Sequence, residues 1–225
     1  MLSSILFTHN LEILYGSLTL FTSILHNVFL LYHVDMFVTV YRIDKVSFWF
    51  GEAVFLAWNS LNDPLFGWIS DSKFLHESNN EKSFSNSDIV WSRLSSLQKF
   101  GPLFSVSFTL FWINWHWPGA QFAACLCFYD GCLTMIDLHH NALLADLSIS
   151  AEKRTKLNSY CSIFSAIGSV SVFMSYLFWN KSDTRVFRNF CFVLAIIAFF
   201  GYVVVLNAMK SSYYKQAKDS SSLKQ

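Results

Sequence analysis

Residues 58–71 read WNSLNDPLFGWISD, and they place amides, a carboxylate and a proline inside an otherwise apolar run. An ionisable group at bilayer depth costs about 2.5 kcal/mol or more, so such groups are retained mainly where they face a bundle interior, a cavity or an ion path. Asp63 is therefore a candidate functional residue. The alternative is a hydrogen bond between helices that only holds a membrane bundle together.

The composition of the chain is that of an integral membrane protein. Hydrophobic residues make up 53% of its 225 residues, aromatic residues 18% and charged residues only 14%, whereas about a quarter of the residues in soluble domains are charged. The lipid bilayer is thus the first expected partner. A net charge of +1 gives no support to a nucleic-acid partner, which would require clustered basic residues.

Six apolar segments are long enough to cross a bilayer, which takes about 20 residues. All six should be α-helices, because backbone groups inside lipid must be hydrogen-bonded within their own segment. The sequence therefore predicts an all-α membrane protein with a six-helix bundle over residues 13–209. The expected spans are 13–34, 47–69, 99–117, 121–147, 157–179 and 187–209.

The distribution of basic residues predicts the orientation of these spans, since cytoplasmic loops retain an excess of Lys and Arg. With the N-terminus inside, eleven of the sixteen basic residues fall on the cytoplasmic side. We therefore expect both termini in the cytoplasm, and we expect the plasma membrane as the location. The segment 1–12 lacks a basic start and a small-residue cleavage site, so we expect the first span to be retained.

The polar segments outside the spans are predicted to be solvated. Residues 1–12 form a cytoplasmic N-terminus, residues 70–98 a cytoplasmic loop, and residues 211–225 a polar cytoplasmic tail. The loop is rich in Ser, Asn and charge, a composition that cannot bury enough apolar surface to fold alone. Asn180, in the sequence Asn-Lys-Ser, is the candidate glycosylation site in an outside loop.

Neither an enzyme nor a resident metal is expected. The five cysteines lie in apolar segments without a C-x-x-C pair, so zinc and redox spacings are both lacking, and packed reduced thiols are predicted. His139 and His140 are adjacent, and their side chains point about 100° apart on a helix, so they cannot readily share one ion. No cofactor is expected.

Three of the expected helices each carry one polar stripe, at separations of three, four, seven or eleven residues. Stripes facing lipid would be prohibitive, so they should face one another across a water-accessible cavity. The stripes consist of Thr19, Ser23 and His26 with Asn27 beside them; Glu52, Asn59 and Asp63 with Asn62 beside them; and Asp130, Thr134, Asp137 and Asn141.

Residues 58–67 resemble the second-helix signature W-D-A-x-N-D-P-x-x-G of the glycoside–pentoside–hexuronide cation symporters, the melibiose-permease branch of the major facilitator superfamily. Asn62-Asp63-Pro64 and Gly67 match it, whereas Asn59 replaces its first aspartate. The resemblance runs from Tyr15-Gly16 through the sixth span. It implies the N-terminal half of a major facilitator fold, and symport of a small polar solute such as a carbohydrate.

The resemblance also implies roles for individual residues. A cation, sodium or a proton, is expected at Asp63, Asn59, Asn62 and Thr134, where oxygen ligands suit a hard cation. The missing carboxylate at Asn59 could weaken sodium binding, shift coupling to a proton on Asp63, or abolish coupling. The expected solute-binding residues are Asp137, Ser23 and Asn141, to which Asp130 is added from the same stripe. The expected gating residues are Asp146, Arg154 and Asp71.

Major facilitator carriers move one six-helix half against another, and this chain resembles one half. The half could pair with a second half, associate with itself, or be a truncated form or a pseudocarrier. Two further function classes therefore stand beside symport. One is a non-transporting membrane interaction protein. The other is an intramembrane enzyme, but no nucleophile and no metal-ligand spacing in the sequence supports this class.

Overall fold

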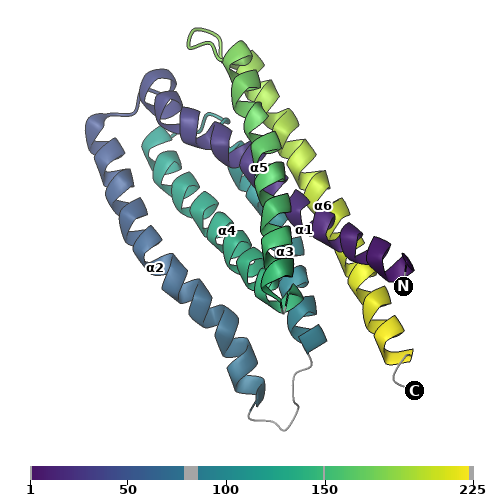
Figure 1. Cartoon of the computed structure of the whole chain (residues 1–225). Coiled ribbons are helices and arrows are strands. Elements are labelled where there is room, and N and C mark those ends of the chain that lie inside the picture. Colours follow the sequence, from purple (N-terminus) through teal and green to yellow (C-terminus); the bar gives the residue numbers. More distant parts are fainter. Residues whose placement is uncertain (1, 79–85, 149, 223–225) are drawn as a thin grey trace.

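The structure is a computed structural model that describes residues 2–78, 86–148 and 150–222, and within these ranges it is a bundle of long helices without strands. The start of α1 and the end of α6 lie at the same end of the bundle as the end of α2 (Figure 1). The helices are α1 (Leu2–Asp35), continued by a short π-helix η1 (Met36–Val40), α2 (Lys45–Ser78), α3 (Asn86–Leu110), α4 (Pro118–Leu147), α5 (Ala151–Phe178) and α6 (Arg185–Ser222).

Aromatic side chains fill the centre of the bundle. Phe29 of α1 stacks on Tyr129 of α4 at 4.1 Å between ring centroids, and it meets Phe111 edge-on at 4.9 Å. Phe104 of α3 lies 4.8 Å from the same Tyr129 ring. These side chains are buried, and offset or edge-on geometry adds about 0.5–1.5 kcal/mol per pair beyond area burial. They fix α1, α3 and α4 around one core.

Two glycines allow α1 and α5 to pack closely along each other. A Cβ on Gly168 would lie 2.9 Å from the carbonyl oxygen of Leu20 and 2.8 Å from Cβ of Ser23. A Cβ on Gly16 would lie 2.6 Å from Cβ of Tyr160. Small residues at such contacts let membrane helices approach closely. The α1–α5 pair therefore forms a tight unit on which a polar wall can be built.

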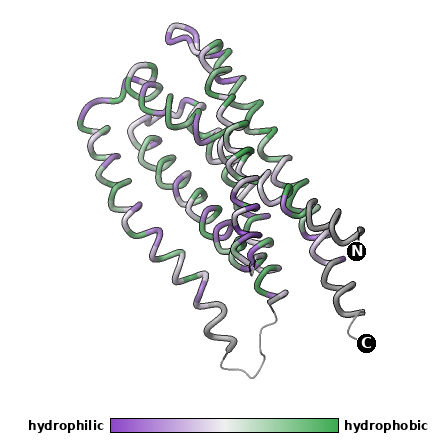
Figure 2. Tube along the Cα trace, in the orientation of Figure 1, coloured by the Kyte–Doolittle hydropathy of each residue, from purple (hydrophilic) through white to green (hydrophobic). Residues whose placement is uncertain are grey.

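Four helical segments are long and apolar enough to cross a membrane, by length and composition: Leu11–Val40, Pro118–Leu147, Ala151–Phe178 and Arg185–Lys215. The prediction of an all-α membrane protein is thus confirmed. The six expected spans correspond to six helices, and four of these are long and apolar enough to cross a membrane. Polar and apolar positions alternate along α2 (Figure 2), where Glu52, Asn59 and Asp63 lower the hydropathy. The five cysteines are free.

The helices continue beyond the predicted apolar spans and into the segments predicted to be solvated. The predicted loop 70–98 is helical up to Ser78 and again from Asn86, the predicted tail 211–225 is helical up to Ser222, and residues 2–12 belong to α1. Propagating an existing helix costs little compared with nucleating one, so polar turns extend the spans. Residues 79–85 of the loop and 223–225 of the tail lie outside the described residues.

The predicted third span, 99–117, ends early, because α3 stops at Leu110. The buried amide of Gln121 explains the stop. Its Nε2 donates to the carbonyls of Leu110, at 2.8 Å, and Ile113, at 2.6 Å, and its Oε1 accepts from the amide of Trp115 at 3.1 Å. This side chain replaces helical hydrogen bonds and stabilises the connection to α4.

Pro64 of the signature lies inside α2, and the helix runs through it. Proline removes one backbone donor and frees the carbonyl four residues earlier, that of Ser60. Such freed carbonyls are tolerated in membrane helices where nearby polar groups or local adjustments satisfy them. The signature therefore lies on a continuous helical surface.

Candidate solute and cation sites

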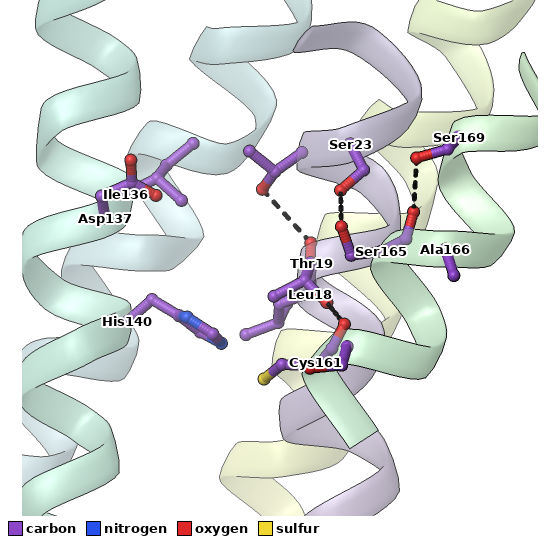
Figure 3. Close-up of a pocket in the computed structure, with 12 residues that line it drawn as sticks. Leu18, Thr19, Ser23, Ile136, Asp137, His140, Cys161, Ser165, Ala166 and Ser169 are labelled. Carbon is purple, nitrogen blue, oxygen red and sulfur yellow. Dashed lines mark hydrogen bonds between the residues drawn. The ribbon is translucent and has the colours of Figure 1, made fainter. Parts of the chain in front are cut away.

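A polar pocket of about 640 Å³ lies between α1, α4 and α5. Asp137 and His140 come from α4 on one side, and α1 and α5 form the other side (Figure 3). The volume is in the range of small-molecule sites. The polar side chains lining it are Thr19, Thr22, Ser23, Asp137, His140, Ser162, Ser165 and Ser169.

A ladder of hydrogen bonds builds the α1–α5 wall of this pocket. Thr19 donates to the carbonyl of Cys161 at 3.0 Å, and the hydroxyls of Ser23 and Ser165 are 2.9 Å apart. One turn further, Asn27 donates to Ser169 at 3.0 Å. The partners are 142 residues apart in each case, so α1 and α5 run parallel in a fixed register. The ladder holds several hydroxyls at the pocket surface.

The α4 wall presents one carboxylate and one imidazole. The buried ring of His140 stacks on Tyr15 at 4.2 Å, its Nε2 lies 3.3 Å from the carbonyl oxygen of Tyr15, and Tyr15 donates its hydroxyl to the carbonyl of His140. These contacts with Tyr15 fix the orientation of the His140 ring. Asp137 forms no hydrogen bond or ion pair within the described part of the chain, so its carboxylate is available to accept hydrogen bonds from solute hydroxyls.

A second polar cluster joins α2 to α4. Nδ2 of Asn62 donates to the carboxylate of Asp130 and to the hydroxyl of Thr134, the latter at 3.3 Å. Asn62 is fully buried, and its Oδ1 has no hydrogen-bond partner among the described residues. Burying an unsatisfied carbonyl oxygen costs about 1–3 kcal/mol. A cation bound beside it would supply the missing partner.

The structure thus brings some of the predicted residues together and leaves others apart. Ser23 and Asp137 meet in the pocket, whereas Asn62, Thr134 and Asp130 meet at α2–α4, so Asp130 lies with the expected cation ligands rather than the expected solute ligands. The side chains of Asn59, Asp63 and Asn141 are exposed and line neither group.

Residues 14–225 match the family described as MFS/sugar transport protein. The chain belongs to this family. It is 58% identical over 206 residues to transmembrane protein 180 of Gallus gallus, and 54% identical over 210 residues to transmembrane protein 180 of Mus musculus. These matches cover 92% and 93% of the chain and 40% of each relative, so the chain spans less than half the length of these relatives. No solved structure matches the chain.

Membership makes the chain a transporter-like membrane protein of the MFS/sugar transport family, and it confirms the resemblance to the major facilitator superfamily. The name transmembrane protein 180 states no solute and no coupling ion. What the two relatives support is the family assignment, not a substrate.

At the end of this MFS bundle where α4 meets α5, the predicted gating residues have unexpected partners. Nε of Arg93, on α3, lies 2.5 Å from Oδ2 of Asp146, and both side chains are mostly buried. Arg154 donates from Nε to the carbonyl of Ser148 at 3.2 Å rather than pairing with Asp146. Asp71 is exposed. The ion pair therefore joins α3 to α4.

The candidate glycosylation site lies in the connection between α5 and α6. Asn180 is exposed, and its Oδ1 accepts a hydrogen bond from the amide of Ser182 at 2.9 Å. This local turn presents the side chain away from the bundle. Use of the site stays a prediction.

Sequence reasoning missed the α5 side of the pocket. Ser162, Ser165 and Ser169 all line it, and their separations of three, four and seven residues are those of one helix face. The pattern was readable in the sequence, but serine is common enough in membrane helices that its stripe carries less weight than one containing a carboxylate. Arg93 was likewise counted only as a loop charge.

Proposed function

We propose that the chain forms the N-terminal half of a cation-coupled symporter for a small polar solute such as a carbohydrate. The observation that carries the proposal is the pocket between α1, α4 and α5, in which the unengaged carboxylate of Asp137 faces a wall of hydroxyls held in register. A solute with several hydroxyls could donate to the carboxylate and exchange hydrogen bonds with Thr19, Ser23 and Ser165. Water-filled space near the bilayer midplane is where carriers bind their solutes.

The coupling cation is proposed to bind at Asn62, Asp130 and Thr134, with Asp63 adding negative charge nearby. Carboxylate, amide and hydroxyl oxygens are ligands for a hard cation such as sodium. Both clusters share α4, where Asp130, Thr134 and Asp137 lie within two turns of one helix. A shift of α4 caused by the cation would therefore alter the pocket directly, and this supports coupling. Sodium and a proton remain the two candidate ions.

We further propose that six helices span the plasma membrane, with both termini in the cytoplasm. The charge asymmetry of the sequence supports this orientation. Cysteine substitutions at Ser182 and Ser92 test it with an impermeant thiol reagent on intact cells. Ser182 should react from outside and Ser92 should not; the reverse pattern would overturn the orientation.

Alternating access requires a second half, which is proposed to be another six-helix unit or a second copy of this chain. The test is solute uptake into liposomes by the chain alone and by the chain joined to a second six-helix half. Neutral mono- and disaccharides are offered under imposed sodium or proton gradients. Saturable, gradient-driven uptake that requires either the joined second half or pairing of two copies of the chain supports the proposal. Binding without uptake in every arrangement would contradict it.

The alternative function is a non-transporting half-carrier, such as a pseudocarrier or a membrane interaction protein. One observation favours it: Asn59 replaces the first signature aspartate and, like Asp63, lies exposed and away from the Asn62 cluster. A cation bound at the Asn62 cluster would contact only one carboxylate of that cluster, that of Asp130, which accepts a hydrogen bond from Asn62. Loss of cation dependence in an otherwise folded protein would support this alternative.

A further inference from the structure

An apolar groove of about 410 Å³ runs between α3 and α6, on a part of the molecule that the proposed solute and cation sites do not use. The adjoining face of α6 exposes Val193, Ile196 and Phe200, and this helix is the most apolar of the four candidate spans. The groove therefore opens towards hydrocarbon. Its lining includes Ser105, Val106 and Thr109 of α3 and Phe192, Ile196 and Phe199 of α6.

The two hydroxyls next to the groove do not call for a polar ligand. Ser105 donates to the carbonyl of Gly101 at 3.3 Å, and Thr109 donates to that of Val106 at 2.7 Å. Each hydroxyl is satisfied by its own helix, a common arrangement for Ser and Thr in helices. An apolar occupant leaves no donor unpaired here. An acyl chain meets this requirement.

A basic cluster lies further along the same α3–α6 contact. Lys210 places Nζ 2.5 Å from Oε1 of Gln98 and 5.1 Å from the ring centroid of Trp91, while Gln98 donates to Asn207 at 2.6 Å. These contacts hold the ammonium group between the helices. Lys99 directly follows Gln98, the residue that binds Lys210, and it is exposed. Within the described residues neither lysine forms an ion pair, so two like charges stand together without a counterion.

Helix geometry aligns the basic cluster with the groove. Lys99 and Val106 are seven residues apart on α3, and Lys210 and Phe199 are eleven apart on α6, so each pair shares one helix face. The rise of 1.5 Å per residue separates the lysines from the groove by roughly 10–16 Å. A positive end followed by an apolar channel matches an anionic headgroup followed by its acyl chain.

We propose that the α3–α6 seam, from Lys99 and Lys210 to the groove at Val106 and Phe199, binds an anionic phospholipid. The lysines and Trp91 contact the phosphate and headgroup, and one acyl chain occupies the groove. Basic pockets between membrane helices recognise anionic headgroups by charge, and tryptophan at the same depth fits the interfacial zone. A neutral protein helix in the groove would supply no negative charge to Lys99 and Lys210, so an anionic lipid fits the site better.

The test measures lipid retention by the purified chain in neutral detergent, using native mass spectrometry. Dioleoyl phosphatidylserine and dioleoyl phosphatidylcholine are offered at equal concentration. With two lysines near the headgroup, the serine lipid should be retained about 30-fold more tightly. The variant K99Q/K210Q should lose this preference. The control K45Q/K153Q removes two exposed lysines elsewhere and should keep it.

Three further arms separate the seam from general charge attraction and from misfolding. V106W fills the groove and should weaken retention of the serine lipid while the lysines stay in place. K99Q alone, at an exposed position, should reduce the preference about fivefold. Glycerophosphoserine without acyl chains should not bind saturably. Helix content by circular dichroism must match the wild type in each variant.

Several results would overturn the proposal. These are equal retention of the two lipids, a preference that persists in K99Q/K210Q, or a preference that V106W leaves intact. Saturable binding of glycerophosphoserine alone would show that the groove is not used. A chain that is dimeric in detergent, that V106W makes monomeric, and that shows no lipid preference would assign the seam to a second copy.

Discussion

Asn62 of α2 donates a hydrogen bond to the carboxylate of Asp130 of α4 from a fully buried position, and its own carbonyl oxygen is left without a partner in the described part of the chain. This contact joins the signature helix to the helix that carries Asp137. The carboxylate that contacts Asn62 is that of Asp130, whereas Asp63 is exposed.

The first prediction follows from that contact. If Asn62, Asp130 and Thr134 bind sodium, then sodium at 100 times its Kd should stabilise the purified chain by about 2.7 kcal/mol. Asp130→Asn removes the charge and keeps the shape, so this stabilisation should vanish. The measurement is the thermal unfolding midpoint in sodium chloride against choline chloride. Asp44→Asn, in the exposed connection before α2, should respond to sodium like the wild type. A sodium shift that survives in Asp130→Asn would refute the assignment.

The second prediction concerns the contact between α1 and α5. Gly168→Ala places a methyl group 2.9 Å from the Leu20 carbonyl oxygen, where backbone must move, so it should destabilise the bundle by about 1–3 kcal/mol. Gly67→Ala is the matched control, because nothing lies within 4 Å of its added Cβ. That change should be neutral or stabilising by up to about 1 kcal/mol. Unfolding by denaturing detergent in bicelles measures both, and equal effects would contradict the packing described.

The third prediction compares two ion pairs. Arg93 and Asp146 are mostly buried, with side-chain exposures of 13% and 19%, whereas Lys181 and Asp35 are exposed to 59% and 30%. A double-mutant cycle with Arg93→Gln and Asp146→Asn should give a coupling free energy of about 1–3 kcal/mol. The cycle with Lys181→Gln and Asp35→Asn should give about 0.2–1 kcal/mol. Similar coupling free energies in both cycles would contradict the conclusion that the Arg93–Asp146 ion pair stabilises the contact between α3 and α4.

The sequence was sufficient for the helices and for the polar stripes, because membrane helices obey two strong rules. Their backbones must be internally bonded, and their polar groups must avoid lipid. The same rules explain why Ser23 and Asp137 meet in one pocket. Asn59 and Asp63 are exposed and contact neither polar cluster, because a stripe spans a wide arc and only packing decides which part of it faces a neighbour. In α2 that part is Asn62.

Helix ends and charge partners were the least predictable features. Polar turns extend α2 beyond residue 69 and begin α3 at Asn86, although composition indicated a loop. Arg93 pairs with Asp146 across 53 residues, although Arg154 lies much nearer to Asp146 in the sequence. Local pattern cannot rank such partners, because the pairing depends on how α3 lies against α4.

The last prediction concerns Asp137, the carboxylate that the pocket leaves unengaged. A neutral sugar that raises the unfolding midpoint of the chain is first identified from a panel of mono- and disaccharides. Hydrogen bonds to a charged acceptor contribute about 1.5–3 kcal/mol, so Asp137→Asn should weaken binding of that sugar roughly 10- to 100-fold. Sodium should still stabilise the Asp137→Asn variant, because Asn62, Asp130 and Thr134 are unchanged.

Two controls make the Asp137 result specific. Asp183→Asn removes a carboxylate from the exposed α5–α6 connection and should leave the affinity for the sugar unaltered. Ser165→Ala removes the hydroxyl that is hydrogen-bonded to Ser23. This change should weaken binding of the sugar less than Asp137→Asn does, since a neutral hydrogen bond contributes about 0.5–1.5 kcal/mol. Unchanged affinity in Asp137→Asn, measured on protein with wild-type helix content, would exclude this pocket as the solute site. Loss of the sodium response together with sugar binding would instead make Asp137 part of the cation site.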